Sequence, residues 1–314
     1  MVQPKTIILT GPTASGKTGL AIQTALELRK INVQLEIINA DSVCFYQEFD
    51  IGSAKPTLDE MELVPHHLVN IAHPKLNYHA GQFLRDCGKT LEEIHARGNR
   101  AIIVGGSGFY LKALRLGLWE APATDENFRA AMDSIDTTTL FQKLLTLDPH
   151  HAHKIGANDR YRIIRALEII EVGGGKTPTE LEAAMSHEPD SRFELWVIDR
   201  EKEELDERIR IRVKKMLELG WVDETKLLQS KYPDSKTLLA VGYQQVVDDL
   251  AGKLPEGRIK KTGEIGLMDE ISLAHRQLAK HQRTWFKNLK PNESFMLDKD
   301  QLNLKEKLMN FYQK

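Results

Sequence analysis

A glycine-rich octapeptide near the amino end constrains this chain more than any other stretch. It matches the pattern G-x-x-x-x-G-K-[ST], in which backbone N–H groups surround a diphosphate, the lysine reaches its outer oxygens and the hydroxyl holds magnesium. The residues of this loop are Gly11, Pro12, Thr13, Ala14, Ser15, Gly16, Lys17 and Thr18. A β-branched apolar run precedes the loop, and apolar residues recur at helical spacing after it. We therefore expect a strand, a phosphate-binding loop (P-loop) and a helix whose positive end faces an anion.

Two further strands are predicted at residues 36–41 and 100–104, with an amphipathic helix between them. The first strand ends in the carboxylate of Asp41, and the second runs into the glycine-containing segment 105–107. Alternating strands and helices are typical of a parallel α/β sheet, in which ligands bind at the carboxyl ends of the strands. We therefore expect the P-loop, Asp41 and residues 105–107 to lie on one rim of the sheet.

The character of the sequence changes at about residue 119. Strand signals vanish, helical patterns such as Leu140, Leu144 and Leu147 continue to about residue 190, and strand character returns at residues 193–199. The expected fold class is α/β, a P-loop-type parallel sheet flanked by helices, with an all-helical insertion domain. The expected parts are a first core segment, 1–118, a helical insertion, 119–190, and a second core segment with basic C-terminal helices, 191–314.

Composition narrows the class of protein. Of the 314 residues, 28% are charged and 41% hydrophobic. No apolar run approaches the roughly 20 residues of a membrane span, and the amino end lacks a signal-peptide profile, so we expect a cytoplasmic protein with no membrane partner. Cys44 and Cys87 form no C-x-x-C pair, which argues against a disulfide framework or a cysteine zinc site. Histidines cluster at His66-His67 and at His150, His151 and His153, but no cysteine or H-E-x-x-H spacing typical of a metal site accompanies them.

The net charge of −2 does not favour a nucleic-acid partner, but cations are concentrated in two predicted helices. The first contains Arg208, Arg210, Arg212, Lys214 and Lys215. In the second, Arg276, Lys280, Arg283 and Lys287 recur at helical spacing and share one face. The opposite face, expected to pack on the core, carries Ile271, Ala274, Leu278 and Trp285. From residue 270 to residue 287, only Glu270 offsets the cations of the second helix, and this imbalance favours a phosphate backbone as partner.

The P-loop alone does not identify its ligand. A nucleotide kinase or ATPase, which would bind ATP, is one candidate, and such enzymes place a magnesium-holding aspartate after an apolar run. Asp41 and Asp199 both follow such runs, so this test leaves both open. No Asn-Lys-x-Asp sequence for reading guanine is present, which disfavours a GTPase.

Short motifs along nearly the whole chain form a recognisable set. Besides the P-loop, they are Asn39-Ala40-Asp41-Ser42 with Tyr46, Asp50-Ile51-Gly52-Ser53-Ala54-Lys55-Pro56, Pro65-His66-His67-Leu68, Val104-Gly105-Gly106-Ser107, Arg162-Ile163-Ile164-Arg165-Ala166-Leu167-Glu168, Val241-Gly242-Tyr243 and Gln277-Leu278-Ala279-Lys280. Together and in this order they closely resemble the tRNA dimethylallyltransferases, also called tRNA isopentenyltransferases. The zinc finger of eukaryotic relatives is absent from the sequence, which favours the bacterial type.

The resemblance implies transfer of a dimethylallyl group from dimethylallyl diphosphate to the exocyclic amine of the adenosine just 3′ of the anticodon, releasing diphosphate. It implies Asp41 as the base that takes the amine proton. Lys17, the loop amides and Mg²⁺ held through Thr18 would stabilise the leaving group. Arg212, matched to the arginine of the family's Arg-Ile-x-x-Arg helix, and Thr13 would contact the diphosphate.

The resemblance also implies a tRNA anticodon stem-loop as partner. The matched contact residues are Asp41, Ser42, Val43, Cys44, Ser107, Arg129, Tyr161, Arg162, Ile163, Ile164 and Arg165. Residues 41–44 match the segment that holds the target base, which must leave its stack to be reached. The helical insertion would grip the anticodon stem.

Some positions depart from the family pattern. Cys44 stands where many members have glutamine, so no side-chain hydrogen bond to a base is expected there. Ser107 replaces the commoner threonine and keeps the hydroxyl. His275 and His281 replace an expected threonine and arginine, which weakens one phosphate contact at neutral pH.

Three rival functions stay open. An adenylate isopentenyltransferase would modify free AMP-type nucleotides, but it would not need the insertion or the second basic helix. A small-molecule P-loop kinase would turn over ATP without prenyl transfer, and a non-catalytic RNA-binding module would tolerate the loss of Asp41. The protein is expected to be a monomer because nothing in the sequence suggests an obligate dimer.

Overall fold

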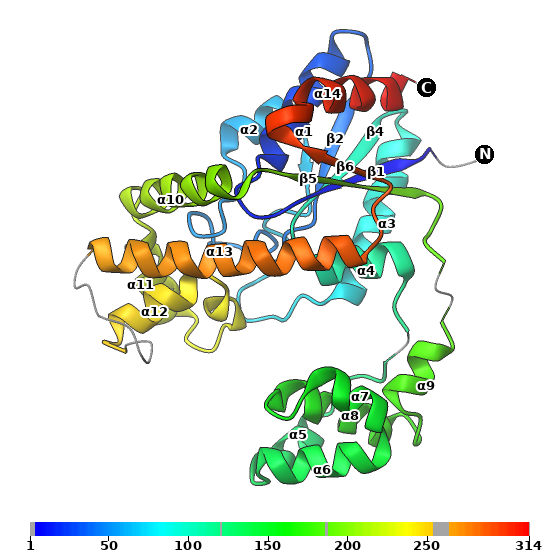
Figure 1. Ribbon diagram of the computed structural model, residues 1–314, viewed down its shortest axis with the longest axis vertical. Helices are drawn as coiled ribbons and strands as arrows, with labels where there is room; N and C mark the ends of the chain where they lie inside the picture. Colours follow the sequence, from blue (N-terminus) through cyan, green and yellow to red (C-terminus); the bar gives the residue numbers. More distant parts are fainter. Residues whose placement is uncertain (1–3, 120, 186–187, 254–263, 314) are drawn as a thin grey trace. The chain divides into compact units, whose positions relative to one another are not determined.

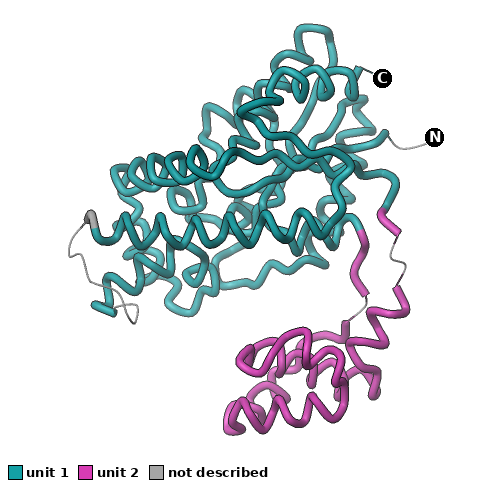
Figure 2. Tube along the Cα trace, viewed as in Figure 1, with its two compact units in different colours: residues 1–115, 190–314 teal, residues 116–189 magenta. Residues whose placement is uncertain are grey.

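The computed structural model describes residues 4–119, 121–185, 188–253 and 264–313. The chain forms two compact units, one made of residues 1–115 and 190–314 and the other of residues 116–189 (Figure 2). The larger unit is thus assembled from both ends of the chain. The smaller unit occupies nearly the stretch expected for the insertion, 119–190.

Within the described residues, the larger unit contains a six-stranded sheet with the order β3-β2-β4-β1-β5-β6. Figure 1 labels β1, β2, β4, β5 and β6 of this sheet. The strands are β1 (Thr6–Thr10), β2 (Leu35–Asn39), β3 (His66–His67), β4 (Arg100–Val104), β5 (Phe193–Asp199) and β6 (Glu293–Met296). All neighbouring pairs are parallel, and Ile8 of β1 pairs with Ile103 of β4 and Leu195 of β5. The carboxyl ends of the strands therefore share one rim, which confirms the predicted α/β fold.

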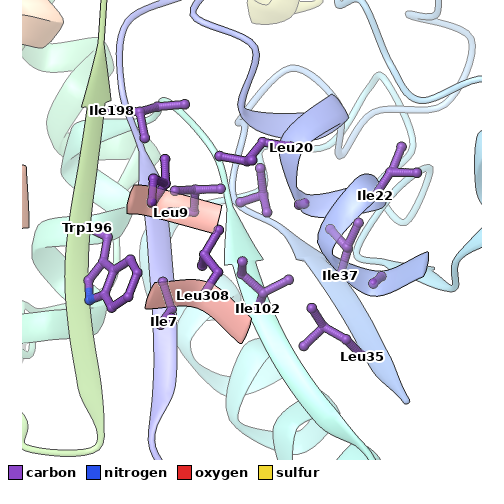
Figure 3. Packing of buried hydrophobic residues seen from close by; sticks show 14 of the residues in the cluster. Ile7, Leu9, Leu20, Ile22, Leu35, Ile37, Ile102, Trp196, Ile198 and Leu308 are labelled. Carbon is purple, nitrogen blue, oxygen red and sulfur yellow. The ribbon is translucent and has the colours of Figure 1, made fainter. Parts of the chain in front are cut away.

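Successive residues of the central strands point to opposite faces of the sheet and form two hydrophobic layers. The flanking helices are α1 (Lys17–Arg29), α2 (Leu58–Leu63), α3 (Ala80–Ala96), α4 (Gly108–Leu116) and α14 (Leu297–Gln313). Ile7 and Leu9 are buried with Leu20 of α1 and Leu308 of α14, as Figure 3 shows. Ile8 is buried on the other face, in the cluster that includes residues of α3 and α4. The chain ends in the strand β6 and the helix α14.

A third hydrophobic cluster joins the helices that follow β5. They are α10 (Lys202–Glu218), α11 (Trp221–Lys231), the 3-10 helix η1 (Lys236–Leu239), α12 (Tyr243–Leu250) and α13 (Glu264–Asn288). Trp221 and Tyr243 are fully buried at its centre, where their rings contact each other and Tyr243 also contacts Phe49. This core packs the two basic helices, α10 and α13, against each other.

The described residues of the smaller unit form helices joined by loops and include no strand. The unit contains α5 (Glu126–Asp133), α6 (Thr137–Leu147), α7 (Pro149–Ile155), α8 (Arg160–Val172) and α9 (Pro178–Ala183). At each helix start a side-chain oxygen accepts a backbone N–H, which satisfies one of the unpaired donors of the first turn. Leu140 and Leu144 of the predicted stripe are buried, but Leu147, at the end of α6, is 42% exposed. None of the helices described in either unit combines the length and apolarity needed to cross a membrane.

Candidate active site

The P-loop connects β1 to α1, and two glycines allow its path. Gly16 precedes α1 with a φ of 99°, in the left-handed region that favours glycine. A Cβ on Gly11 would lie 2.1 Å from the carbonyl oxygen of Ile198, so the loop approaches β5 too closely for a side chain there. Because α1 begins at Lys17, its unpaired N–H groups and positive end face the loop. This geometry suits an anion.

Lys17 lies among the charged groups of the rim. Its Nζ donates hydrogen bonds to the carbonyl oxygens of Gly11, at 2.8 Å, and Pro12, at 2.9 Å. Burial lowers the pKa of Lys17 to about 8; the charge of Asp41 opposes this change, and that of Arg212 adds to it. Burial also lowers the pKa of Arg212, again opposed by Asp41. Asp41, Lys17 and Arg212 are therefore close enough to interact electrostatically.

Asp41 follows β2 and is held in a tight turn. Its Oδ1 accepts the N–H of Val43 at 3.1 Å, and the side chain of Asn39 binds both the N–H and the carbonyl oxygen of Asp41. A Cβ on Gly105 would lie 2.2 Å from the carbonyl group of Ala40, so the ends of β2 and β4 approach too closely for any residue but glycine. The segments expected on one rim are therefore brought together there.

Two arginines, one just before α10 and one within it, contact backbone carbonyl groups of the P-loop. Arg200 Nε donates to the carbonyl oxygen of Ser15 at 3.0 Å, and Arg208 Nε donates to that of Ala14 at 2.9 Å. The sequence shows Arg208 only as one cation of a basic helix, whereas this contact makes it a support of the loop. The contact was missed because it joins positions far apart in the chain.

Arg212 of α10 contacts the P-loop through the tip of its guanidinium group. Its Nη1 donates to Thr13 Oγ1 at 3.3 Å. Its Nε is buried and has no hydrogen-bond partner in the described part of the chain. A buried charged donor without a partner is costly, and an anion such as a diphosphate would satisfy it.

Gln282 of α13 is a site residue that sequence reasoning did not identify. Its Oε1 accepts the N–H of Thr13 at 2.8 Å, and its Nε2 donates to the carbonyl oxygen of Gly106 at 2.9 Å. Next to Gly106, Ser107 Oγ accepts the N–H of Ser42 at 2.8 Å and donates to Ser42 Oγ at 3.1 Å. A continuous set of hydrogen bonds therefore runs from the P-loop to the residue beside Asp41.

The IPP transferase family model matches residues 44–289. The chain belongs to the IPP transferase family. It is 37% identical, over 94% of its length and 92% of the relative's, to tRNA dimethylallyltransferase 1 of Citrifermentans bemidjiense. It is 38% identical to the tRNA dimethylallyltransferase of Chromobacterium violaceum, over 91% of this chain and 87% of the relative. These matches confirm the family resemblance.

Solved structures of the IPP transferase family resemble this one along most of the chain. The full-length tRNA isopentenylpyrophosphate transferase of Bacillus halodurans has a TM-score of 0.65 and 31% identity, covering 98% of this chain and 97% of that one. A eukaryotic dimethylallyltransferase acting on tRNA has a TM-score of 0.73 and 28% identity, covering 90% of this chain and 69% of that one.

Among the family-matched tRNA residues of the larger unit, Ser42 and Ser107 face each other on the rim, as their hydrogen bonds show. Val43 is partly buried against the third hydrophobic cluster. Cys44 is 5% exposed, its Sγ lies 3.7 Å from the carbonyl oxygen of Ser53, and burial raises its pKa. The Cys44 side chain therefore contacts protein.

The basic face of α13 divides into two parts. Arg283 forms a bidentate ion pair with Asp199 and donates to the carbonyl oxygen of Arg200, whereas Lys280 and Lys287 are exposed. Arg283, one of the four cations considered for a phosphate backbone, is therefore already paired within the protein. The ion pair also occupies Asp199, whereas Asp41, the other aspartate considered for magnesium, interacts electrostatically with Lys17.

Two aromatic positions of α13 also differ from expectation. Trp285, expected in the core, is 40% exposed and lies over Gly108, where a Cβ would meet its indole ring. His275 is 6% exposed, and its Nδ1 lies 2.9 Å from the carbonyl oxygen of Ile271. Burial, with a smaller effect of Arg212, lowers the pKa of His275 to about 4, so this histidine is neutral and belongs to the core instead of a phosphate surface.

Family-matched residues of the smaller unit fall into two groups. Arg129 and Arg165 form ion pairs with Glu168, whose side chain is fully buried. Ile163 is fully buried, and Ile164 packs against the same core. Tyr161 is 63% exposed and the Arg162 side chain 66% exposed. Tyr161 and Arg162 therefore offer the surface that RNA could contact, while Ile163 offers none.

The site also bears on the Mg²⁺ implied by the family. The described residues contain no group of three His, Cys, Asp or Glu side chains that could hold a metal. Mg²⁺ commonly binds through one or two protein oxygens, substrate phosphates and water. Thr18, in the first turn of α1 beside Lys17, has a hydroxyl that fits this mode of binding.

Proposed function

We propose that this protein transfers a dimethylallyl group from dimethylallyl diphosphate to the exocyclic amine of the adenosine 3′ of the anticodon in tRNA. The relatives named above carry names for this activity. The observation that carries the proposal is that Arg212 contacts the P-loop at Thr13 and that side-chain hydrogen bonds connect the same loop to the segment beside Asp41. An anion site and a proton acceptor thus share one rim.

In the proposed step, the adenine nitrogen forms a bond to the first carbon of the dimethylallyl group while the carbon–oxygen bond to the diphosphate breaks. The amine is a weak nucleophile because its lone pair is delocalised into the ring. Asp41 takes the proton lost from the amine. Lys17, Arg212 and the loop amides stabilise the charge that develops on the departing diphosphate.

Mg²⁺, held by Thr18 with diphosphate oxygens, would add charge neutralisation to the leaving group. Thr13 would orient the diphosphate, because its hydroxyl already contacts Arg212. Release of inorganic diphosphate then completes the reaction without consumption of ATP.

We propose further that the smaller unit and α13 bind tRNA outside the reacting base. The exposed Tyr161 suits stacking on a base, and exposed Arg162, Lys280 and Lys287 suit phosphate contacts. All the residues proposed for the chemistry come from a single chain, so we propose that the monomer is sufficient.

Incubation with radiolabelled dimethylallyl diphosphate tests the function. Label should pass to unmodified tRNA and, after digestion, should be found on the adenosine 3′ of the anticodon. Label passing to AMP and not to tRNA would instead identify an adenylate isopentenyltransferase. Metabolite-dependent ATP turnover without prenyl transfer would identify a kinase.

A further inference from the structure

Gln282 joins two loops that belong to different halves of the proposed reaction. One end of its amide accepts the N–H of Thr13, at 2.8 Å, and the other donates to the carbonyl oxygen of Gly106, at 2.9 Å. The fit is close, because a Cβ on Gly106 would lie 2.7 Å from Gln282 Nε2. The amide supplies both the acceptor and the donor that this bridge needs.

Each end of the bridge continues into the site. Thr13 belongs to the P-loop, and its hydroxyl accepts a hydrogen bond from Arg212. Gly106 precedes Ser107, whose hydroxyl binds the backbone N–H and the hydroxyl of Ser42, the residue after Asp41. Gln282 therefore lies between the diphosphate side and the side of the proposed base.

We propose that Gln282 is a positioning residue that sets the distance between the P-loop and the loop beside Asp41. This inference rests on the proposed function. Transfer requires the diphosphate carbon and the adenine amine to meet at a defined separation, and misplacement by about 1 Å can cost on the order of 100-fold in rate. Gln282 controls that separation without contacting either reacting atom.

The fold of α13 does not depend on this amide. Ile271, Ala279 and Phe286 anchor the helix in hydrophobic clusters, and Arg283 pairs with Asp199. Substitution of Gln282 should therefore leave α13 in place, and a change in rate can be separated from unfolding.

The test compares Gln282→Met, which keeps the length of the side chain and removes both hydrogen bonds, with Gln282→Glu. The glutamate still accepts from Thr13 but places a second oxygen against the carbonyl of Gly106. Asn288→Leu, an equivalent loss of an exposed amide on the same helix, is the control. For each protein we would measure kcat, the Kd values for inorganic diphosphate and for unmodified tRNA, and the thermal midpoint.

Both Gln282 variants are expected to lose about 10- to 100-fold in kcat, with each Kd within about threefold of wild type and the thermal midpoint little changed. Asn288→Leu should match wild type. Unchanged kcat in Gln282→Met, full activity in Gln282→Glu, or a loss explained by weaker diphosphate binding alone would overturn the inference. A wild-type protein that transfers no label to tRNA would instead refute the proposed function.

Discussion

Asp41 combines two roles that can be separated experimentally. Its Oδ1 accepts the N–H of Val43 and so shapes the turn after β2, while its charge acts on Lys17 and Arg212. Asparagine has an oxygen that can form the same turn, but it cannot accept a proton at neutral pH. The substitution therefore isolates the proposed function as base.

Asp41→Asn should lower the rate of prenyl transfer by about 100-fold or more, because general-base catalysis contributes on the order of 10² to 10⁴. The Kd for tRNA should stay within about threefold of wild type. Single-turnover transfer of labelled dimethylallyl groups measures the rate, with exposed Asp59→Asn as control. An Asp41→Asn enzyme of normal rate would exclude this residue as the base.

The lowered pKa of Lys17 predicts a pH dependence of anion binding. Burial favours the neutral amine, so in the ligand-free protein the ammonium loses its proton as the pH rises through about 8. Affinity for inorganic diphosphate should therefore be high below pH 8 and fall above it. Calorimetric titrations between about pH 6.5 and 9.5 would measure this change.

Diphosphate itself titrates, so a matched variant is needed for that experiment. Lys17→Met should bind diphosphate weakly at every pH and lack the additional fall near pH 8 that Lys17 causes. If diphosphate affinity changed with pH in the same way in wild type and Lys17→Met, the fall in affinity would come from titration of the ligand and not of Lys17.

At the scale of elements, α13 supports the site on one side and faces solvent on the other. Arg283 and Gln282 connect it to β5, to the P-loop and to the loop after β4, whereas Lys280 and Lys287 are exposed. Helical spacing correctly predicts that these cations share a face. It cannot show that a carboxylate from β5 meets one of them.

Arg283→Ala and Lys287→Ala should therefore differ. Arg283→Ala should lower the free energy of unfolding, and its double-mutant cycle with Asp199→Ala should give a coupling of about 0.5–3 kcal/mol. Lys287→Ala should leave stability unchanged and reduce the salt dependence of tRNA binding by about one phosphate contact. Denaturant unfolding and binding at several salt concentrations measure the two effects. Zero coupling would show that the Arg283 pair contributes little.

At the scale of the whole molecule, the two compact units have separate cores. The smaller unit is centred on the buried carboxylate of Glu168, which accepts hydrogen bonds from Arg129, Arg165 and the N–H of Asp125. Although burial raises the pKa of Glu168, these hydrogen bonds outweigh it and lower the pKa from its ordinary value of 4.5 to about 2.

Glu168→Gln should destabilise the smaller unit by about 3–5 kcal/mol, because two arginines lose their buried partner. Hydrogen exchange should accelerate in α8 but not in β1, and diphosphate binding should be unchanged.

The pKa of Glu168 in the folded protein is below its ordinary value. Glu168 therefore stabilises the smaller unit above about pH 4.5, and this contribution is lost as the pH falls toward 2. The variant should lack this acid-induced loss. Equally faster hydrogen exchange in α8 and in β1 would show that the two units do not unfold independently.

One family motif, residues 50–56, lies outside the P-loop and shows what sequence comparison can and cannot identify. The segment that begins at Asp50 matched the family motif, and the structure shows that its backbone is held in place by a side chain from another helix. Glu224 of α11 accepts the N–H groups of Asp50, Ile51 and Gly52, and Tyr243 donates to the same carboxylate. A family match thus identified an important segment, while only the packed structure identified its partner.

The sequence by itself determined the features whose physics is local. The P-loop, the strand before it and the helix after it follow from residue spacing and from the glycine at position 16, and the rim position of Asp41 follows from strands that all run in one direction. Tertiary structure alone decided which groups meet: Gln282 with Thr13 and Gly106, Arg283 with Asp199, and His275 with the core. Hydrogen bonds and ion pairs between residues far apart in the chain, and the burial of a side chain, depend on how the elements pack in three dimensions. Such packing leaves no periodic pattern in a single sequence.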